Sequence, residues 1–473
     1  MTPVCIVGLL YRDAGDAGVA PTGPWCHGML ASPDNPYRRQ RPGAAGNRHR
    51  LSYGELLAVL GVALLAFALA DAAARWPNFN PDESRWLSRA HYVADLADPL
   101  GPTWADQYMT RGQPPLGSYV MGIGLLAQGR DLETNAPWDF SLTWEQNIAL
   151  GHKPVPEDLA AGRRTSAALV ALTAVALIGV ARVYLAMPWA IGAGALFAIH
   201  PFTSYIGAIA MSDALFGLSI ALAAWAAAAF ARCPSWGRAV LVGVLLGLGG
   251  ATKLSPLAVA AGLGMAGVLT FTAGVIRRRR FAPGEAAYWV RGIAIAVAAL
   301  LTFIASYPYL WPNPIGHTRH LFAFRIEEMA AQSSDWPVMA VPDRVEALRR
   351  VNVNFTERYN LSTSLIALFG GPPTVSMVRQ VEILIPLLGL ILMAGSAVRD
   401  GPYSPRALVL AVLGGQVLVT ILGMRSEFDR YHVPMALPGA IAAAVALEWL
   451  VWRARSLLVA KDRLAPATGS MSR

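Results

Sequence analysis

Long apolar segments alternate with short polar ones along most of the chain. Most of the apolar segments are about 18 to 22 residues long, enough to cross roughly 30 Å of hydrocarbon as an α-helix. Ten segments are predicted to span a membrane, at 55–74, 165–185, 189–206, 214–231, 238–252, 255–276, 292–310, 380–398, 407–423 and 432–452. The pattern therefore predicts an all-α, polytopic membrane protein.

Composition supports the same class of protein. The 473 residues are 55% hydrophobic and only 15% charged, with a mean hydropathy of +0.42, which lies outside the usual range of soluble domains. The net charge of +9 would suit a nucleic acid, but the Lys and Arg residues fall between the apolar segments and not on one soluble face. We expect the lipid bilayer as a partner, and no nucleic acid.

The basic residues predict the orientation of the chain. Residues 1–54 are rich in Pro, Gly and Arg and are predicted to be a disordered, basic tail. With ten spans, the connections on the side of this tail hold ten basic residues: Arg182, Arg232, Arg238, Arg277 to Arg280, Arg291, Arg399 and Arg406. The short connections on the other side hold only Lys253, Arg425 and Arg430. By the positive-inside rule the N-terminus is cytoplasmic, and 453–473 form a second cytoplasmic tail.

Two connections on the predicted outer side are unusually long, at 75–164 and 311–379, and loops of such length commonly carry function. The first contains an apolar stretch, Pro115 to Gln128, that is short and interrupted by glycines, so we expect it to lie at the membrane interface. In the second, Pro342 to Arg358 has apolar residues at helical spacing and is predicted to be an amphipathic interfacial helix. Both loops belong to one transmembrane domain, 55–452.

An acidic pair follows the first predicted span. Asn80 suits an N-cap, Pro81 the first helical position and Glu83 the third, so the stretch is a good helix start without any function. The pair also permits chemistry, because adjacent helical side chains diverge by roughly 100°. Asp82 would then face a cavity as a general base, while Glu83 supports it or holds a divalent cation with it.

A second acid, Asp213, precedes the predicted span at 214–231, on the same outer side as Asp82. Ser212 could cap that helix, and Asp213 could lie in its first turn, where the helix dipole favours an acid. Two convergent carboxylates at a bilayer surface would equally suit activation of an acceptor by general base catalysis.

Cationic residues occur at helix ends on the same side, where the charge bias predicts few of them: Lys253, Arg425, Arg430 and His432. Snorkelling toward the membrane surface explains such residues without any function. A lipid-phosphate donor would need them, because its anionic head must be bound and its leaving phosphate stabilised. Arg111 is a further candidate, just before the turn that Gln113, Pro114 and Pro115 form.

Six stretches taken together are similar to those of a known class of proteins: Asp82-Glu83, Gln113-Pro114-Pro115-Leu116, Arg163 to Ala167, Met211 to Ala214, Thr252-Lys253, and Arg430-Tyr431 to Pro438. In this order they resemble the GT-C class of membrane glycosyltransferases, in particular the superfamily of protein O-mannosyltransferases and lipid A aminoarabinose transferases. The resemblance covers mainly residues 51–260. It implies the GT-C fold, with juxtamembrane helices in the long first outer loop.

The resemblance also implies an activity. The donor would be a polyprenyl-phosphate-linked sugar, and transfer would proceed by direct displacement with inversion at the anomeric carbon. Asp82 would be the catalytic carboxylate, Lys253 and Arg430 would contact the donor phosphate, and Tyr431 with His432 would lie beside the substrate.

The chain departs from the family at one point. Relatives usually carry an acidic residue just before the Pro-Pro turn, whereas this chain has Arg111, Gly112 and Gln113 there. Whether Glu83, Asp106 or Asp213 replaces that acid, and whether a divalent cation is bound at all, stays open. No other cofactor is implied.

Two other functions are compatible with these residues. A transporter or flippase for a lipid-linked glycan would use the carboxylates for proton coupling, but it predicts ionisable residues deep inside the spans, where almost none occur. A catalytically inactive subunit of the same fold would explain the missing acid near Arg111. The acceptor is left open as a protein, a lipid or a glycan, and the compact chain and family pattern favour the plasma (inner) membrane of a bacterium.

Overall fold

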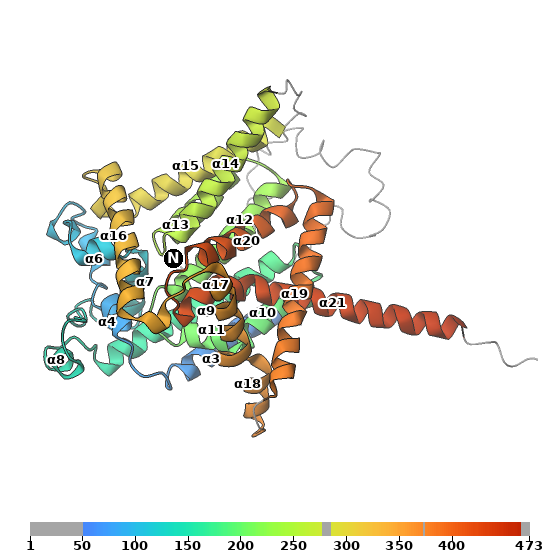
Figure 1. Ribbon diagram of the computed structural model, residues 1–473, viewed down its shortest axis with the longest axis horizontal. Helices are drawn as coiled ribbons and strands as arrows, with labels where there is room; N and C mark the ends of the chain where they lie inside the picture. The colour runs from blue at the N-terminus through green and yellow to red at the C-terminus, as the bar shows by residue number, and fades with distance from the viewer. Residues whose placement is uncertain (1–50, 277–284, 372–373, 465–473) are drawn as a thin grey trace, which may run out of the picture.

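The computed structural model describes residues 51–276, 285–371 and 374–464, and over these residues it consists of helices with one isolated β-bridge (Figure 1). Eight of the described helices are long and apolar enough to span a membrane: α3 Tyr53–Ala73, α9 Pro156–Ala181, α12 Asp213–Arg232, α14 Ser255–Ile276, α15 Glu285–Ala305, α19 Ser376–Asp400, α20 Pro405–Gly423 and α21 Val433–Leu464. Two shorter apolar helices, α10 Met187–Ile199 and α13 Trp236–Gly250, occupy the remaining predicted spans. The prediction of an all-α, multi-pass membrane protein is confirmed.

The long connections are folded into short helices. The first holds α4 Pro81–Leu87, α5 Tyr92–Asp95, η2 Pro102–Trp104, α6 Tyr108–Gly112, α7 Leu116–Ala127 and α8 Trp144–Ala149. The second holds η3 Pro308–Leu310, α16 Pro314–Asp335, η4 Pro337–Met339, α17 Arg344–Val353, the π-helical turn η5 Asn354–Arg358 and α18 Leu361–Leu368. Two further helices, α11 Pro201–Gly207 and η6 Asp429–His432, lie between spans.

Three predicted boundaries differ from the structure. The segment predicted as one span at 189–206 is broken, because His200 is extended between α10 and α11. Pro201 causes this break, since the residue before a proline is disfavoured in the helical region. Helix α9 begins at Pro156 and not at 165, with Pro at its first position and two acids in its first turn. Helix α21 continues to Leu464, so part of the predicted tail at 453–473 is helical; the rest, like 1–50 and Arg277 to Arg280, lies outside the described residues.

The connections fall on two faces of the helix bundle, as the alternation of spans predicts. On one face Tyr184 donates to the carbonyl oxygen of Arg406 at 2.6 Å, and Arg291 donates to that of Pro234 at 2.8 Å. On the other face, the backbone N–H of Leu116 at the start of α7 donates to Ala251 at the end of α13, at 3.0 Å. We call this second face the site face, because both long loops lie on it.

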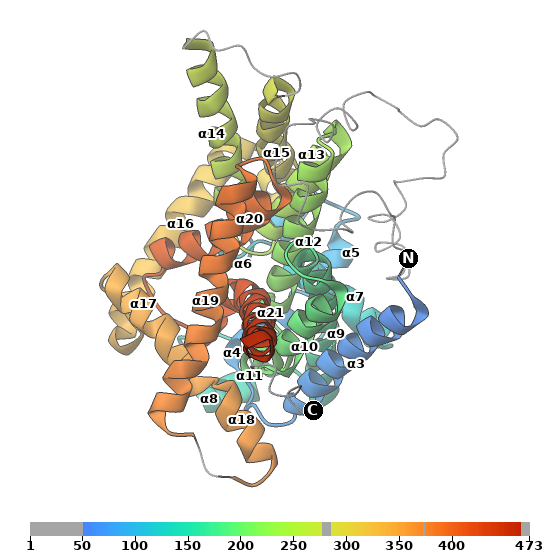
Figure 2. The same cartoon turned by 90° about the vertical axis from the view of Figure 1, so that its right-hand side faces the viewer.

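Helices α9 and α12 form the centre of the bundle (Figure 2). Within their most apolar windows, 67% and 72% of the residues are buried, against 22% for α3, α15, α19 and α20. Small side chains allow such close helix packing in a membrane, and α12 buries a run of them: Ala221, Ala223, Ala224, Ala226, Ala227 and Ala228. Asp213, at the start of α12 on the site face, therefore belongs to one of the two most buried of these helices.

A close backbone approach between α19 and α21 provides a test of this packing. A Cβ atom at Gly389 would overlap the carbonyl oxygen of Ala442, whereas one at Gly395 on the same helix would meet nothing. Overpacking of this kind costs about 1–3 kcal/mol, so Gly389→Ala is expected to lower the thermal unfolding midpoint in detergent. Gly395→Ala is the control, with an unchanged or higher midpoint; equal midpoints would contradict the packing.

The two long loops pack against each other. Tyr307 donates a hydrogen bond to the carbonyl oxygen of Thr110, and Tyr108 donates to Glu328 on α16 at 3.1 Å. Figure 1 shows α16 beside α6, with α17 closer to the centre of the bundle. Helix α17 has exposed Val345 and Leu348, as expected for an interfacial helix, but Phe355 turns inward and packs on Phe202 with ring centroids 5.4 Å apart.

Candidate active site

A cavity of about 440 Å³ opens on the site face. Its walls come from α4, from the starts of α12 and α14, from α16, from the end of α20, and from the α6–α7, α13–α14 and α20–α21 connections. Six charged side chains line it: Asp82, Asp213, Lys253, Arg325, Arg425 and Arg430. The cationic side chains outnumber the carboxylates by two, so the cavity favours an anionic ligand.

Asp82 is placed in the cavity by the predicted helix start. The side chain of Asn80 accepts from the backbone N–H of Asp82 at 3.0 Å, and Glu83 accepts from that of Asn80 at 3.0 Å. This capping box with Pro81 at the first helical position confirms the local prediction. Asp82 then meets Arg430 across the cavity wall, with Oδ2 and Nη2 2.7 Å apart.

Glu83 points away from the cavity and anchors α4. It is fully buried, and each carboxylate oxygen accepts two hydrogen bonds. The guanidinium of Arg163 supplies two of them, both at 2.8 Å, and the backbone N–H groups of Ala210 and Asn80 supply the others. Arg163 also donates to the carbonyl oxygen of Ala74 at 2.7 Å, so this ion pair ties α4 to the end of α3. Glu83 therefore positions Asp82 and does not itself face a substrate.

The second acid, Asp213, is buried in the first turn of α12 and forms an ion pair with Lys253. Ser212 precedes the helix but makes no capping hydrogen bond, so the alternative prediction of a side-chain cap is wrong. Lys253 lies in the turn between α13 and α14, with Nζ 5.2 Å from the ring centre of Tyr431. Burial lowers the pKa of Lys253, and the carboxylate of Asp213 opposes that shift.

Three further cations line the cavity: Arg325, Arg425 and Arg430. The guanidinium of Arg430 stacks on Phe428 at 4.6 Å from its ring centre, and Arg425 is exposed. Arg325 on α16 was not predicted from the sequence; it donates to the carbonyl oxygen of Gly112 at 3.1 Å and pairs with Glu328. Arg325 is one of several charged residues of α16, so nothing in the local sequence singles it out.

The turn before α7 contributes only in part. Gln113 and Pro114 line the cavity, and the side-chain oxygen of Gln113 is held by Arg89. Pro115 does not line it, and Arg111 lies outside, paired with Asp106 at 2.8 Å.

Two neighbouring predicted residues of the α20–α21 connection differ in their placement. Tyr431 lines the cavity. His432 is fully buried behind it, with Nε2 3.8 Å from Glu427.

The acidic pair does not fit a divalent cation. Glu83 has all four of its acceptor positions occupied, and the carboxylates of Asp82 and Asp213 each form an ion pair with a cationic side chain. In the part of the chain that the structure describes, no three His, Cys, Asp or Glu residues gather as a metal site would require. We derive no step through a metal ion.

Comparison with solved structures identifies the fold. The Archaeoglobus fulgidus oligosaccharyltransferase tethered to an acceptor peptide matches with a TM-score of 0.50 at 14% identity, over 89% of this chain and 52% of that one. The chain has the GT-C fold. ArnT from Cupriavidus metallidurans, bound to undecaprenyl phosphate, matches with a TM-score of 0.49 at 17% identity, over 84% of this chain and 61% of that one. The S. cerevisiae protein O-mannosyltransferase Pmt1-Pmt2 complex, bound to the sugar donor, matches with a TM-score of 0.41 at 15% identity, over 56% of this chain and 35% of that one.

The chain therefore spans about half the length of the oligosaccharyltransferase. No protein-family model matches the sequence, and no curated protein matches it. At these identities the likeness establishes the fold, and the activity has to be argued from the cavity.

Proposed function

We propose that this protein is a glycosyltransferase that moves a sugar from a polyprenyl-phosphate-linked donor to an acceptor at the outer face of the membrane. The observation that carries the proposal is the cavity in which Asp82, on a rigid helix start, meets a set of cations on the site face. Lys253 and Arg430 would bind the donor phosphate, and Arg325 and Arg425 would add positive charge at its entrance.

The residues account for a single displacement step. Asp82 accepts the proton of an acceptor hydroxyl, and the acceptor oxygen forms a bond to the anomeric carbon. The bond from that carbon to the phosphate oxygen breaks, and its electron pair stays on the polyprenyl phosphate, where Lys253 and Arg430 stabilise the added charge. Attack opposite the leaving group inverts the anomeric carbon. Asp213 holds Lys253 in place for this role.

The ion pair between Asp82 and Arg430 suggests how the site responds to its donor. Both groups line the cavity, so an incoming phosphate competes with Asp82 for the guanidinium. Transfer of Arg430 to the phosphate would leave the carboxylate free to accept a proton. The base is therefore expected to become available when the donor is bound.

The location is part of the proposal. We place the site face on the outer side of a bacterial plasma membrane and the N-terminus in the cytoplasm. The positive-inside distribution of Lys and Arg supports this orientation. The acceptor would reach the cavity beside the long loops, and it is a protein, a lipid or a glycan.

A matched pair of arginine variants tests the proposal. The purified protein is given polyprenyl-phosphate sugars one at a time with candidate acceptors, and release of free polyprenyl phosphate is measured. Arg430→Gln removes a charged hydrogen bond of about 1.5–3 kcal/mol, so the KM for the active donor is expected to rise roughly 10- to 100-fold. Arg111→Gln, on the same face but outside the cavity, is the control and should keep the wild-type KM.

Two outcomes would contradict the proposal. Specific binding of a lipid-linked sugar without release, for every donor and acceptor, would favour a flippase or an inactive subunit. Equal effects of the two arginine variants would place the phosphate outside this cavity.

A further inference from the structure

The α20–α21 connection, residues 424–432, carries both Arg425 and Arg430 to the cavity, and a buried acid lies between them. Glu427 is 1% exposed, so its charge is removed from water. An isolated buried carboxylate is strongly unfavourable unless it is paired and hydrogen-bonded. The two arginines that pair with Glu427 come from the second long loop, whereas His432 of its own segment lies 3.8 Å from the carboxylate.

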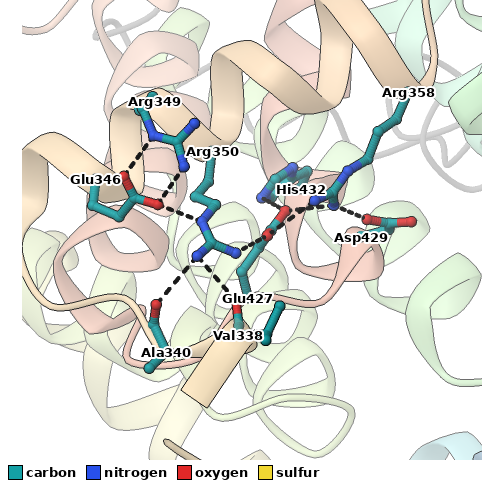
Figure 3. A network of polar contacts seen from close by, with 9 residues as sticks. All are labelled: Val338, Ala340, Glu346, Arg349, Arg350, Arg358, Glu427, Asp429 and His432. Atoms are coloured by element: carbon teal, nitrogen blue, oxygen red, sulfur yellow. Dashed lines mark hydrogen bonds and ion pairs between the residues drawn. The ribbon is translucent and has the colours of Figure 1, made fainter. Parts of the chain in front are cut away.

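Two arginines hold the carboxylate of Glu427 (Figure 3). Arg350 of α17 donates to Oε2 at 2.9 Å, and Arg358 of the π-helical turn donates to Oε1 at 2.8 Å. Arg350 is itself held by Glu346 at 2.5 Å and by the carbonyl oxygen of Val338 at 3.1 Å. Arg358 also forms an ion pair with Asp429, so the network extends from Glu346 to Asp429 (Figure 3).

The π-helical turn explains how both arginines reach one acid. In an uninterrupted α-helix of about 3.6 residues per turn, side chains eight positions apart diverge by roughly 80°. The turn Asn354–Arg358 has an i→i+5 hydrogen bond, from the N–H of Tyr359 to the carbonyl oxygen of Asn354 at 2.9 Å. It takes up an extra residue and rotates Arg358 back toward the face of Arg350, and such π turns are frequent at functional sites.

The backbone joins the same two segments. The N–H of Val341 donates to the carbonyl oxygen of Arg425, and the N–H of Glu427 donates to that of Met339, both at 2.8 Å. These bonds flank the isolated antiparallel bridge between Ala340 and Ser426. Arg425, a cavity cation, is thus bonded through its own backbone to the second loop.

We propose that Glu427 is a positioning residue: with Arg350 and Arg358 it forms a latch that holds the α20–α21 connection, and with it Arg425 and Arg430, over the donor cavity. This inference rests on the proposed function. A network that served only to stabilise the fold would lower the unfolding temperature when broken, but it would leave the donor KM of the folded fraction unchanged.

The first test compares Glu427→Gln with a control variant, Arg349→Gln. Glu427→Gln keeps the shape but removes the charge that binds both arginines. Displacement of the cations by about 1 Å can cost roughly 100-fold, so kcat/KM for the donor is expected to fall by that order, mainly through KM. Arg349→Gln is the control, because Arg349 contacts Glu346 and not Glu427 (Figure 3). Gel filtration and thermal unfolding report whether each variant is folded. Arg358→Lys is a second, more conservative variant, because it keeps the positive charge and changes only the hydrogen-bonding geometry.

The second test replaces the latch by a covalent link. Residues paired across an antiparallel bridge have Cα atoms about 4.5–5.5 Å apart, a distance that a disulfide can span. Ala340→Cys with Ser426→Cys is added to Glu427→Gln, with the cysteine pair in the wild-type background as reference. Oxidation of the triple variant is expected to bring the donor KM most of the way back to the wild-type value, and reduction of its disulfide to raise the KM again. The donor KM of Glu427→Gln alone should be the same under both conditions.

The outcomes separate the latch from the proposed function. A wild-type KM in Glu427→Gln, or a disulfide that forms without restoring it, would overturn the latch while the transferase stands. If wild-type protein releases no polyprenyl phosphate, the proposed function fails, and the latch is then judged by the binding of polyprenyl monophosphate to wild type and Glu427→Gln. Equal binding, or none in the wild type, would overturn the latch as well.

Discussion

Replacing Asp82 by asparagine is expected to reduce release of polyprenyl phosphate by about 10²–10⁴-fold, the usual contribution of a general base. Asparagine has nearly the same shape and can still accept a hydrogen bond from Arg430, but it cannot take the acceptor proton. Because α4 is held by Asn80 and Glu83 and not by Asp82, the helix start should remain intact. The loss is therefore expected in kcat, with a smaller change in the donor KM.

The matched control is Asp106→Asn. Asp106 lies in the same long loop, pairs with Arg111 and accepts from Tyr309 at 3.2 Å, but it does not line the cavity. Release by this variant should stay close to the wild-type rate in the same assay. If Asp82→Asn retained full activity while binding the donor, Asp82 would not be the base, and Asp213 would become the first acid to test.

The second large effect is expected on stability, from the buried ion pair between Glu83 and Arg163. Removing one partner of such a pair costs about 3–5 kcal/mol, because the other charge stays buried without compensation. Glu83→Gln also weakens the hydrogen bonds from the N–H groups of Asn80 and Ala210. The variant should therefore unfold at a clearly lower temperature in detergent and give less folded protein on gel filtration.

The neighbouring arginine provides the control for this prediction. The side chain of Arg164 is 57% exposed, and its contact with Asp71 is long, at 3.6 Å. Exposed ion pairs of this kind contribute about 0–1 kcal/mol to the free energy of unfolding. Arg164→Met should therefore leave the unfolding midpoint almost unchanged, whereas Arg163→Met should lower it as Glu83→Gln does. A midpoint of Glu83→Gln equal to that of Arg164→Met would show that the buried pair is not essential for the fold.

The fold could be predicted from the sequence because a membrane imposes a simple rule. Every spanning segment must form all of its backbone hydrogen bonds within the membrane, so the length of an apolar segment identifies a helix. The positive charge of the connections then indicates on which side of the membrane each one lies. Hydropathy and charge contain no information on local backbone geometry. They therefore did not predict the break at His200 or the start of α9 at Pro156. In both places a proline determines the boundary, and hydropathy carries no information about that.

Part of the candidate site could be predicted because charged residues are uncommon in this chain. Acids and cations at helix ends stand out in a chain that is only 15% charged, and this brought out Asp82, Asp213, Lys253 and Arg430. The buried ion pairs around the site could not be found in the same way. Arg163 lies 80 positions from Glu83, and Arg358 lies 69 positions from Glu427, and no local pattern marks such pairings.

The two acid–cation pairs in the cavity also become possible at very different times during synthesis. Asp213 and Lys253 are 40 positions apart, but Asp82 and Arg430 are separated by 348. At about 5–20 residues per second, a ribosome needs roughly 20–70 s to proceed from Asp82 to Arg430. Until then Asp82 lacks the partner that it has in the folded chain, and the cavity lacks the wall that residues 424–431 supply. If the proposed function holds, a nascent chain would therefore insert most of its helices before it could use a lipid-linked sugar.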